Sequence, residues 1–308
     1  MALYLDPKND LIFKRIFGEH PHLLISFLNA IMPFEEGKFI EEINYLPAEQ
    51  VPDILGKKNS IVDVKCTDNN KNQFIVEMQM FWSESFNNRM VFNAGKAYVR
   101  QLNKNQDYNL LKPVYTLAII NDIFDHKTEE FYHYYQIINR ENTEEVIKGL
   151  SFVLVELPKF QPQSWSDRKL AALWLRFLNE VDENLKKLPL ELEENENISQ
   201  AAELCQIAAF STEELEIYEA YWDAIRMEKT IRNASLQEGE AKGRAEGRAE
   251  GRVEGRAEGR AEGEAIGEKK AAINFAIKLA QKGISKQEIS EMTGLTVQEL
   301  TELLINNC

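Results

Sequence analysis

The sequence predicts an α/β or α+β domain followed by a helical extension at its C-terminus. Helical apolar spacing and period-two alternation succeed one another along the first 230 residues, as in domains that pack helices against a sheet. A chain of 308 residues with 44% hydrophobic side chains is long enough for one large or two modest cores. Glycine then recurs at every fourth position, so we expect a domain at 1–230, a repeat at 231–268 and a small helical unit at 269–308.

The expected elements of the first domain follow from the spacing of their apolar residues. Residues 10–30 show helical spacing that Pro21 interrupts, which predicts one or two opening helices. Two alternating stretches flank a turn-rich run of Asp, Asn and Lys, and they predict an antiparallel hairpin with strands at 60–66 and 74–80. The later elements are a long helix at 82–104, strands at 114–120, 131–138 and 151–157, and a helix at 167–188.

Each strand of the predicted hairpin has one apolar and one polar face. In the first strand the apolar face holds Val62, Val64 and Cys66, and the polar faces of the two strands hold Asp63, Lys65, Glu77 and Gln79. If the register brings the polar faces to one side of the sheet, Asp63 and Glu77 approach each other. Two carboxylates at short range repel unless one is protonated or a cation lies between them, and Mg²⁺ or Mn²⁺ would meet that need. The alternative is an ordinary solvated face on which Lys65 and Arg89 are the ionic partners.

The helix that follows the hairpin has a cationic edge. A stripe about 60° wide contains Arg89, Asn93, Lys96 and Arg100. Beside a pair of carboxylates, such a stripe could hold the phosphates of a duplex without reading its bases. The alternative is a solvated helix face.

Asp10 stands at the start of the first opening helix. A carboxylate there either caps the helix, where it favours the positive end of the dipole, or binds a metal ion through water.

The most regular feature of the sequence is a tetrad repeat in which eight of the fifteen glycines occur, from Gly239 to Gly267. Each glycine inside a helix costs about 1 kcal/mol relative to alanine, so an isolated helix here should be weak. If the helix forms, the aligned glycines would leave a groove for close packing of another helix, and the chain would form a homo-oligomer through its C-terminal region. The alternative is a solvated linker.

Residues 269–308 predict a compact helical unit with clear punctuation. Ser285 with Glu288 and Thr296 with Glu299 have the spacing of capping boxes, and Gly294 separates them. The last helix offers glutamates and no basic residue, which disfavours DNA reading and a role as a transcription regulator. Assembly or partner docking is the preferred interpretation of this unit.

Composition excludes several other classes of protein. No apolar stretch reaches the length of a membrane-crossing helix, and the N-terminus lacks the order of a secretory signal, so we expect a cytoplasmic protein without membrane contact. The three cysteines are far apart and predict neither disulfides nor a zinc site. The net charge of −14 argues at first against binding of nucleic acid. Residues 180–240 alone carry 16 acidic and 5 basic side chains, so the acidity is concentrated in one segment and does not describe the whole surface.

The hairpin residues, taken with several other segments, resemble a known family. Asp63 followed by Glu77-Met78-Gln79 is similar to the Glu-x-Gln variant of the PD-(D/E)XK nuclease superfamily. The chain as a whole resembles the Rpn family of recombination-promoting nucleases and transposases within that superfamily. The segments that carry this likeness include 10–18, Arg89, Asp107-Tyr108, 156–160 and 174–178.

The resemblance implies a restriction-endonuclease-like mixed sheet flanked by helices and a metal-dependent endonuclease acting on double-stranded DNA. Asp63 and Glu77 would then hold Mg²⁺ or Mn²⁺, and Gln79 would occupy the place in which lysine is commoner. Glutamine brings no positive charge, so Lys65 is a candidate substitute, with a simple ion pair as the other reading. The departure at Gln79 also leaves open a non-catalytic DNA-binding or assembly protein that retains the fold.

Overall fold

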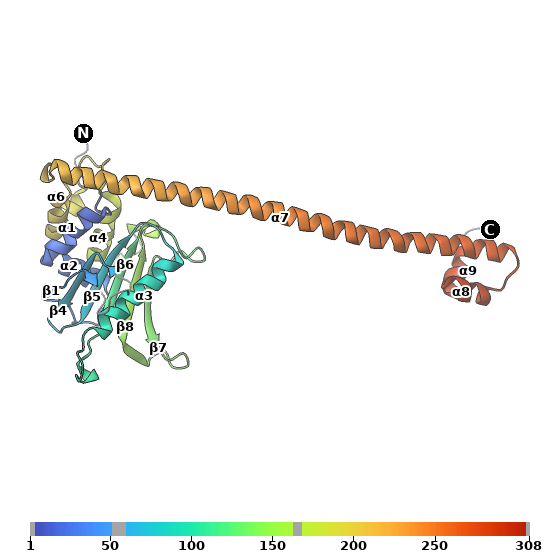
Figure 1. The fold of residues 1–308 in the computed structure, drawn as a ribbon, viewed down its shortest axis with the longest axis horizontal. Coiled ribbons are helices and arrows are strands. Elements are labelled where there is room, and N and C mark those ends of the chain that lie inside the picture. The colour runs from blue at the N-terminus through green and yellow to red at the C-terminus, as the bar shows by residue number, and fades with distance from the viewer. Residues whose placement is uncertain (1–3, 51–59, 163–167, 306–308) are drawn as a thin grey trace. The chain divides into compact units, whose positions relative to one another are not determined.

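The computed structural model describes residues 4–50, 60–162 and 168–305. The chain divides into two compact units, Met1–Met227 and Glu228–Cys308. The first unit contains all the strands of the described residues and most of the helices (Figure 1). Each unit is considered by itself below.

The helices of the first unit begin with the two that the apolar spacing predicted. Pro21 starts the second of them, because its missing N–H is not needed at a first helical position. The helices are α1 (Asp10–Glu19), α2 (Pro21–Ile31), α3 (Glu84–Val99), α4 (Lys169–Glu180), α5 (Leu190–Glu193), α6 (Glu196–Leu204) and the start of α7 (Thr212–Gln281).

The strands form a mixed sheet of six, with a separate pair beside it. The six-stranded sheet has the order β1-β4-β5-β6-β8-β7, in which β5, β6 and β8 run parallel to one another. This mixed α/β architecture confirms the fold class that the sequence predicted. The strands are β1 (Ile43–Tyr45), β4 (Val64–Asp68), β5 (Gln73–Gln79), β6 (Val114–Ile120), β7 (Tyr132–Ile138) and β8 (Val146–Glu156), and the pair is β2 (Glu49–Gln50) with β3 (Ser60–Ile61).

The two faces of the sheet bury different clusters. Val64, Phe74 and Val76 pack with the aromatic and aliphatic side chains of α1, α2 and α4, which make up the larger core. Ile75 points the other way and packs with Ala94 and Ala97 of α3, the helix that crosses from β5 to the parallel strand β6 (Figure 1). Because side chains two residues apart on a strand point to the same face of the sheet, Glu77 lies on the α3 face together with Ile75.

The first strand of the predicted hairpin is interrupted. The expected strand 60–66 is split at Val62 and Asp63, where β3 ends and a bend precedes β4. Val62 packs in the α3 cluster, whereas Val64 packs in the larger core, so the prediction that they share one face is wrong. The bend reverses the alternation at this point.

The β7 strand lies at one edge of the six-stranded sheet. Its side chains Tyr134, Tyr135, Ile137 and Ile138 are exposed, although all are apolar or aromatic. Its pairing with β8 is antiparallel, and the register jumps between Gln136 and Ile137.

The second unit consists of the remainder of α7 with α8 (Lys286–Thr293) and α9 (Val297–Ile305). The capping box predicted at Ser285 and Glu288 is present, and Gly294 takes a left-handed φ of 71° that ends α8. Ala276, Leu279, Ile289, Leu295 and Leu300 form its small core.

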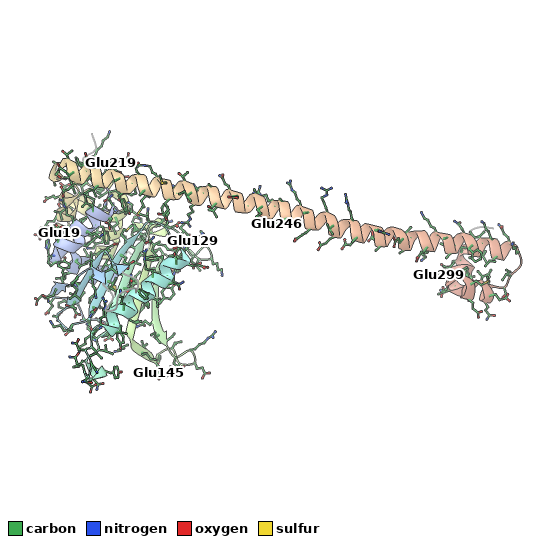
Figure 2. All side chains as sticks on the ribbon, viewed as in Figure 1. Glu19, Glu129, Glu145, Glu219, Glu246 and Glu299 are labelled. Atoms are coloured by element: carbon green, nitrogen blue, oxygen red, sulfur yellow. The ribbon has the colours of Figure 1, made fainter. Side chains whose placement is uncertain are left out.

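The glycine tetrads are helical throughout and lie inside α7. Their neighbours, such as Glu246, extend away from the helix axis (Figure 2), and a Cβ added at any of the eight glycines would meet nothing within 4 Å. Because a step of four residues turns a helix about 40° beyond a full turn, the glycines wind around α7 and form no straight groove.

Candidate functional site

The predicted carboxylate pair lies where β4 begins and β5 ends. Val64 pairs with Val76 in the antiparallel register, so one further step sets Asp63 opposite Glu77. The bend before β4 turns the Asp63 side chain toward the backbone of β5, where its Oδ2 accepts a hydrogen bond of 2.6 Å from the Met78 N–H. The two acidic residues therefore reach the same end of the sheet from neighbouring strands.

Asp63 is in surroundings that oppose its ionisation. Burial raises the pKa of its carboxyl to about 7, and the charges of Glu77 and Asp10 act in the same direction. The Met78 N–H and the more distant Lys14 ammonium lower the pKa but do not offset the loss of water. The negative charge of Asp63 is thus under-compensated by the protein.

Glu77 is 4% exposed and is held from the side of α3. Asn93 donates from Nδ2 to its Oε1 at 3.1 Å, and the Arg89 Nη2 lies 3.8 Å from its Oε2. Burial raises the pKa of Glu77, whereas Arg89 and the Asn93 amide lower it. One neutral and one cationic side chain of α3 therefore orient this carboxylate.

Gln79 is engaged at both ends of its carboxamide. Its Nε2 donates to the carbonyl oxygen of Phe81 at 2.7 Å, and its Oε1 accepts from the Arg89 Nη2 at 2.8 Å. The guanidinium of Arg89 also lies 5.0 Å from the ring centre of Phe86, and about half of its side chain, 48%, is exposed. Gln79 and Phe86 thus position a cation at the edge of the carboxylate pair.

Lys65 lies further along β4, opposite Ile75. Burial lowers the pKa of its ammonium, and the charges of Arg100 and Lys96 lower it further. Its electrostatic neighbours are therefore the two cations at the C-terminal end of α3, where Arg100 is the capping residue. The structure brings Lys65, Lys96 and Arg100 together as one cationic group.

Asn93 does not lie on a surface stripe with Arg89, Lys96 and Arg100 as the sequence predicted. It is fully buried, with 0% exposure, and turns inward to Glu77. The helical wheel placed it near the cations correctly, but the sheet covers that edge of α3 at this turn.

Asp10 is not the capping residue of α1. Asn9 takes that position and accepts from the Leu11 N–H at 3.0 Å. Asp10 is the first helical residue and pairs with Lys14 at 2.7 Å. Its charge raises the pKa of Asp63, which puts a third carboxylate in electrostatic reach of the pair.

The donor set at this site suits a hard divalent cation. No cluster of three or more His, Cys, Asp or Glu side chains with metal-binding geometry occurs within residues 4–50, 60–162 and 168–305. Mg²⁺ commonly binds through one or two carboxylates while keeping waters for substrate phosphates, so a pair of carboxylates such as Asp63 and Glu77 would meet its need for protein ligands. The under-compensated negative charge of Asp63 is the feature that fits Mg²⁺ or Mn²⁺.

A second polar cluster, which the sequence reasoning missed, lies at the ends of the other parallel strands. Glu156 ends β8, is 0% exposed, and accepts from Phe124 N, His133 Nε2 and Lys159 Nζ at 2.6, 2.8 and 2.8 Å. Burial alone would raise the pKa of Glu156, but these hydrogen bonds hold it below its ordinary value. The spacing of Glu156 and Lys159 was the available sequence signal. By itself it does not indicate an ion pair, because both side chains also bind the loop after β6, at Phe124 and Asp125.

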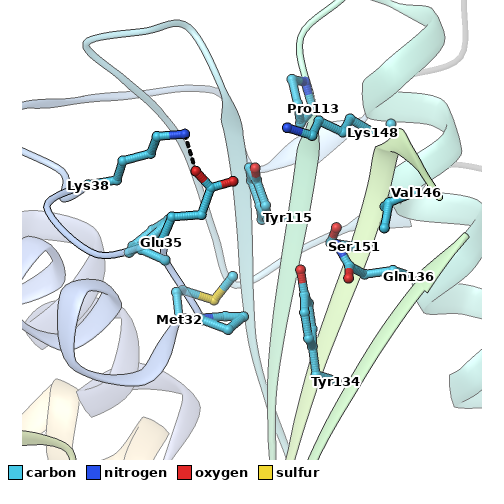
Figure 3. A pocket seen from close by; sticks show the side chains of 13 residues that line it. Met32, Glu35, Lys38, Pro113, Tyr115, Tyr134, Gln136, Val146, Lys148 and Ser151 are labelled. Carbon is cyan, nitrogen blue, oxygen red and sulfur yellow. Dashed lines mark hydrogen bonds and ion pairs between the residues drawn. The ribbon is translucent and has the colours of Figure 1, made fainter. Parts of the chain in front are cut away.

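A hollow of about 360 Å³ lies toward the opposite ends of β6 and β8 (Figure 3). Tyr115, Tyr134 and Ser151 line it, with Glu35 and Lys38 in an ion pair at its side. Tyr134 hydrogen-bonds Ser151, so these polar groups satisfy one another. Tyr115 pairs with Phe74 in the register that joins Glu77 to Ala118, which separates this hollow from the carboxylate pair along the strands.

None of the helices in the described parts of the chain combines the length and the apolar content needed to cross a lipid bilayer.

Comparison with known proteins gives one finding. A family profile described as PD-(D/E)XK nuclease family transposase matches residues 7–234, which include every residue of the site. No curated protein and no solved structure matches the chain.

Proposed function

Because the chain belongs to the PD-(D/E)XK nuclease family transposases, we propose that it is a divalent-metal-dependent endonuclease that hydrolyses phosphodiesters of double-stranded DNA. Its context would be recombination, movement of a mobile element or defence. The observation that supports this proposal best is the meeting of Asp63 and Glu77 at one end of the sheet. A mixed sheet with a carboxylate pair at the ends of two neighbouring strands suits a reaction that needs a cation beside a phosphate.

In this proposal Asp63 and Glu77 hold Mg²⁺ or Mn²⁺. When bound, such an ion supplies positive charge that polarises the scissile phosphate. Asn93 fixes the orientation of Glu77, and the Met78 N–H fixes that of Asp63. Water adds to phosphorus through its oxygen and one P–O ester bond breaks. One proton passes to the leaving oxygen and the other to solvent, which leaves a phosphate monoester and a hydroxyl end.

The cations of α3 and β4 would hold the DNA backbone beside this site. Burial lowers the pKa of Lys65 most and the charges of Arg100 and Lys96 lower it further, and a phosphate group beside these cations would favour their charged forms. Phosphate contacts position a duplex but carry no sequence information, so we propose low sequence specificity. These three cations lie within residues 65–100, whereas residues 180–240 carry 16 acidic and 5 basic side chains, and this uneven distribution reconciles DNA binding with a net charge of −14.

The test is cleavage of supercoiled plasmid by the full chain with Mg²⁺ or Mn²⁺. We expect the wild type to nick or linearise the plasmid, and we expect the cleavage rate of Asp63→Ala and of Glu77→Ala to be lower by more than about 10²-fold. Substitution of a residue that only hydrogen-bonds a metal ligand already lowers activity by about 10- to 100-fold. Glu141→Ala, at an exposed position in the turn after β7, is the matched control and should cleave normally. Undiminished cutting by both site variants would refute these ligand assignments.

The second candidate is a non-catalytic DNA-binding or assembly protein that keeps the nuclease fold. The engagement of both ends of the Gln79 carboxamide favours it, because this side chain offers no positive charge to a reacting phosphate. DNA binding that ignores divalent ions, together with no cleavage in any of them, would establish this alternative.

A further inference from the structure

Gln79 and Arg89 form a paired unit beside the carboxylates, and their geometry decides how positive charge reaches the site. The Phe81 carbonyl can only accept a hydrogen bond, so it fixes the Nε2 end of Gln79 and leaves Oε1 to face Arg89. The orientation of the carboxamide is therefore determined by its neighbours. Gln79 thus acts as an acceptor for a guanidinium, and the Phe81 carbonyl takes up one of the two N–H groups of its Nε2.

Arg89 is the cation nearest to Glu77 among the described residues. Its Nη2 lies 2.8 Å from Gln79 Oε1 and 3.8 Å from Glu77 Oε2. A guanidinium carries five N–H donors in a fixed fork, and the exposed half of this side chain leaves part of the fork open to solvent. A phosphate oxygen approaching the carboxylate pair would meet those donors first.

Lys65 is placed less well for the same task. It pairs with Ile75, two residues before Glu77, and its charged neighbours are Lys96 and Arg100. A cation in that group would help to hold the duplex, whereas Arg89 is the cation that contacts the site residues Gln79 and Glu77.

We propose that Arg89 is a catalytic residue that donates to a non-bridging oxygen of the scissile phosphate, and that Gln79 is the positioning residue that holds it there. This inference rests on the proposed function. The cation would be Arg89 of α3, and Gln79 at the end of β5 would supply the acceptor that orients it. No proton moves in this role, because the guanidinium stays charged and hydrogen-bonds the oxygen as negative charge grows on it.

The pairing predicts an unusual pattern in a double-mutant cycle. Arg89→Ala removes the cation, and Gln79→Lys places an ammonium where Arg89 needs an acceptor, so each single variant should lower the single-turnover cleavage rate about 10²-fold. In the double variant the new lysine can still donate to Phe81 and no longer meets a guanidinium. We expect the double variant to cleave at least about tenfold faster than either single variant.

Two further measurements separate catalysis from folding and from general DNA binding. Arg89→Lys should recover part of the rate lost in Arg89→Ala, because charge returns without the fork. The logarithmic salt dependence of metal-free DNA binding should fall by about one in Arg89→Ala and stay unchanged in Gln79→Ala, since one phosphate contact is lost only in the first. Arg140→Ala, which removes an exposed guanidinium from the turn after β7, is the control.

The results distinguish failure of this inference from failure of the proposed function. If Asp63→Ala is inactive while Arg89→Ala cleaves at the wild-type rate, the nuclease assignment stands and the role of Arg89 is overturned. A Gln79→Lys variant that is as active as the wild type overturns the positioning role of Gln79. If the wild type cleaves nothing, the proposed function fails, and an unchanged salt dependence in Arg89→Ala then overturns the phosphate contact as well.

Discussion

At the scale of single residues, Asp63 is the group whose environment is most informative. Its pKa of about 7 lies above the ordinary 3.8, so the folded protein binds this proton more tightly than the unfolded chain does. Between about pH 4 and pH 7 the unfolded chain has released the proton while the folded protein retains it. The free energy of unfolding therefore decreases as the pH rises through this window.

Asp63→Asn removes this cost and still accepts the hydrogen bond from Met78. In metal-free protein we expect the substitution to stabilise the fold at both pH 5 and pH 8, and by about 2.5 kcal/mol more at pH 8. Urea unfolding in EDTA at the two values measures the difference. Equal effects at both pH values would contradict the raised pKa.

Asn93 is the residue on which the orientation of Glu77 depends most directly. Asn93→Leu keeps the number and branching of the side-chain heavy atoms at this buried position but removes the donor to Oε1. We expect the affinity for Mn²⁺, measured by calorimetry without DNA, to fall about 10- to 100-fold, as it does when other residues that hydrogen-bond a metal ligand are replaced. Normal affinity in a folded Asn93→Leu protein would show that the hydrogen bond is dispensable.

The buried cysteines give a prediction that is independent of the site. Burial raises the pKa of the Cys66 thiol to about 12 and also raises that of Cys205, so neither forms thiolate near neutral pH. In a Cys308→Ser background we expect iodoacetamide at pH 8 to modify them only after denaturation, as read by mass spectrometry. Rapid labelling of the native protein would show that these positions open.

At the scale of secondary-structure elements, the sequence predicted well which segments are helices and which are strands, but it did not predict where a strand is interrupted. Period-two alternation located both strands of the hairpin, because alternation reports a half-buried sheet directly. It gave no warning of the bend at Asp63, which is set by the hydrogen bond to Met78 on the next strand. The start of β8 at Val146 was missed by five residues, since pairing with β7 stabilises this stretch more than its own pattern does.

The site was predictable to a similar degree. Asp63, Glu77 and Gln79 follow from pattern and resemblance, and their roles as ligands stay predictions. The inward turn of Asn93 and the contact of Gln79 with Arg89 depend on how α3 rests on the sheet, which no helical wheel specifies. Partners from different elements, such as Glu156 with His133, were beyond local reasoning for the same reason.

The glycine tetrads of α7 give a prediction for an entire element. Nothing lies within 4 Å of a Cβ built at Gly251 or Gly255, so alanine fits at both positions. Each Gly→Ala change should stabilise the local helix by about 1 kcal/mol. Slower amide hydrogen exchange around residues 247–259 in the double variant would confirm this. If alanine instead weakens self-association of the full chain, the glycines form a close helix contact between copies.

At the scale of the whole molecule, the family match ends at residue 234, while the chain continues through the rest of α7 and the second unit. The second unit has a small core of its own and a last helix without basic residues. We therefore expect it to serve assembly. The domain boundaries drawn from composition stay predictions.

Self-association is the property to measure for that unit. Light scattering of the full chain at micromolar concentration should give a mass above that of one 35.5 kDa chain. In the tetrad repeat Arg and Glu recur around α7, and pairs such as Arg244 with Glu240 and Arg260 with Glu264 join residues one turn apart, so a second copy can exchange these partners. Raising the salt concentration should then lower the mass, and a monomer at every salt concentration would contradict an assembly role.

The register jump in β7 has a consequence for how the protein survives at high concentration. An open sheet margin rich in tyrosine and isoleucine is a template for unwanted fibril growth. Where the register shifts between Gln136 and Ile137, three residues of β8, Lys148, Gly149 and Leu150, have no partner on β7, and such a bulge bends and twists the strand pair locally. A stray strand would have to follow that local twist to bond along the whole margin, so the bulge protects the solution state of a surface that its side chains leave vulnerable.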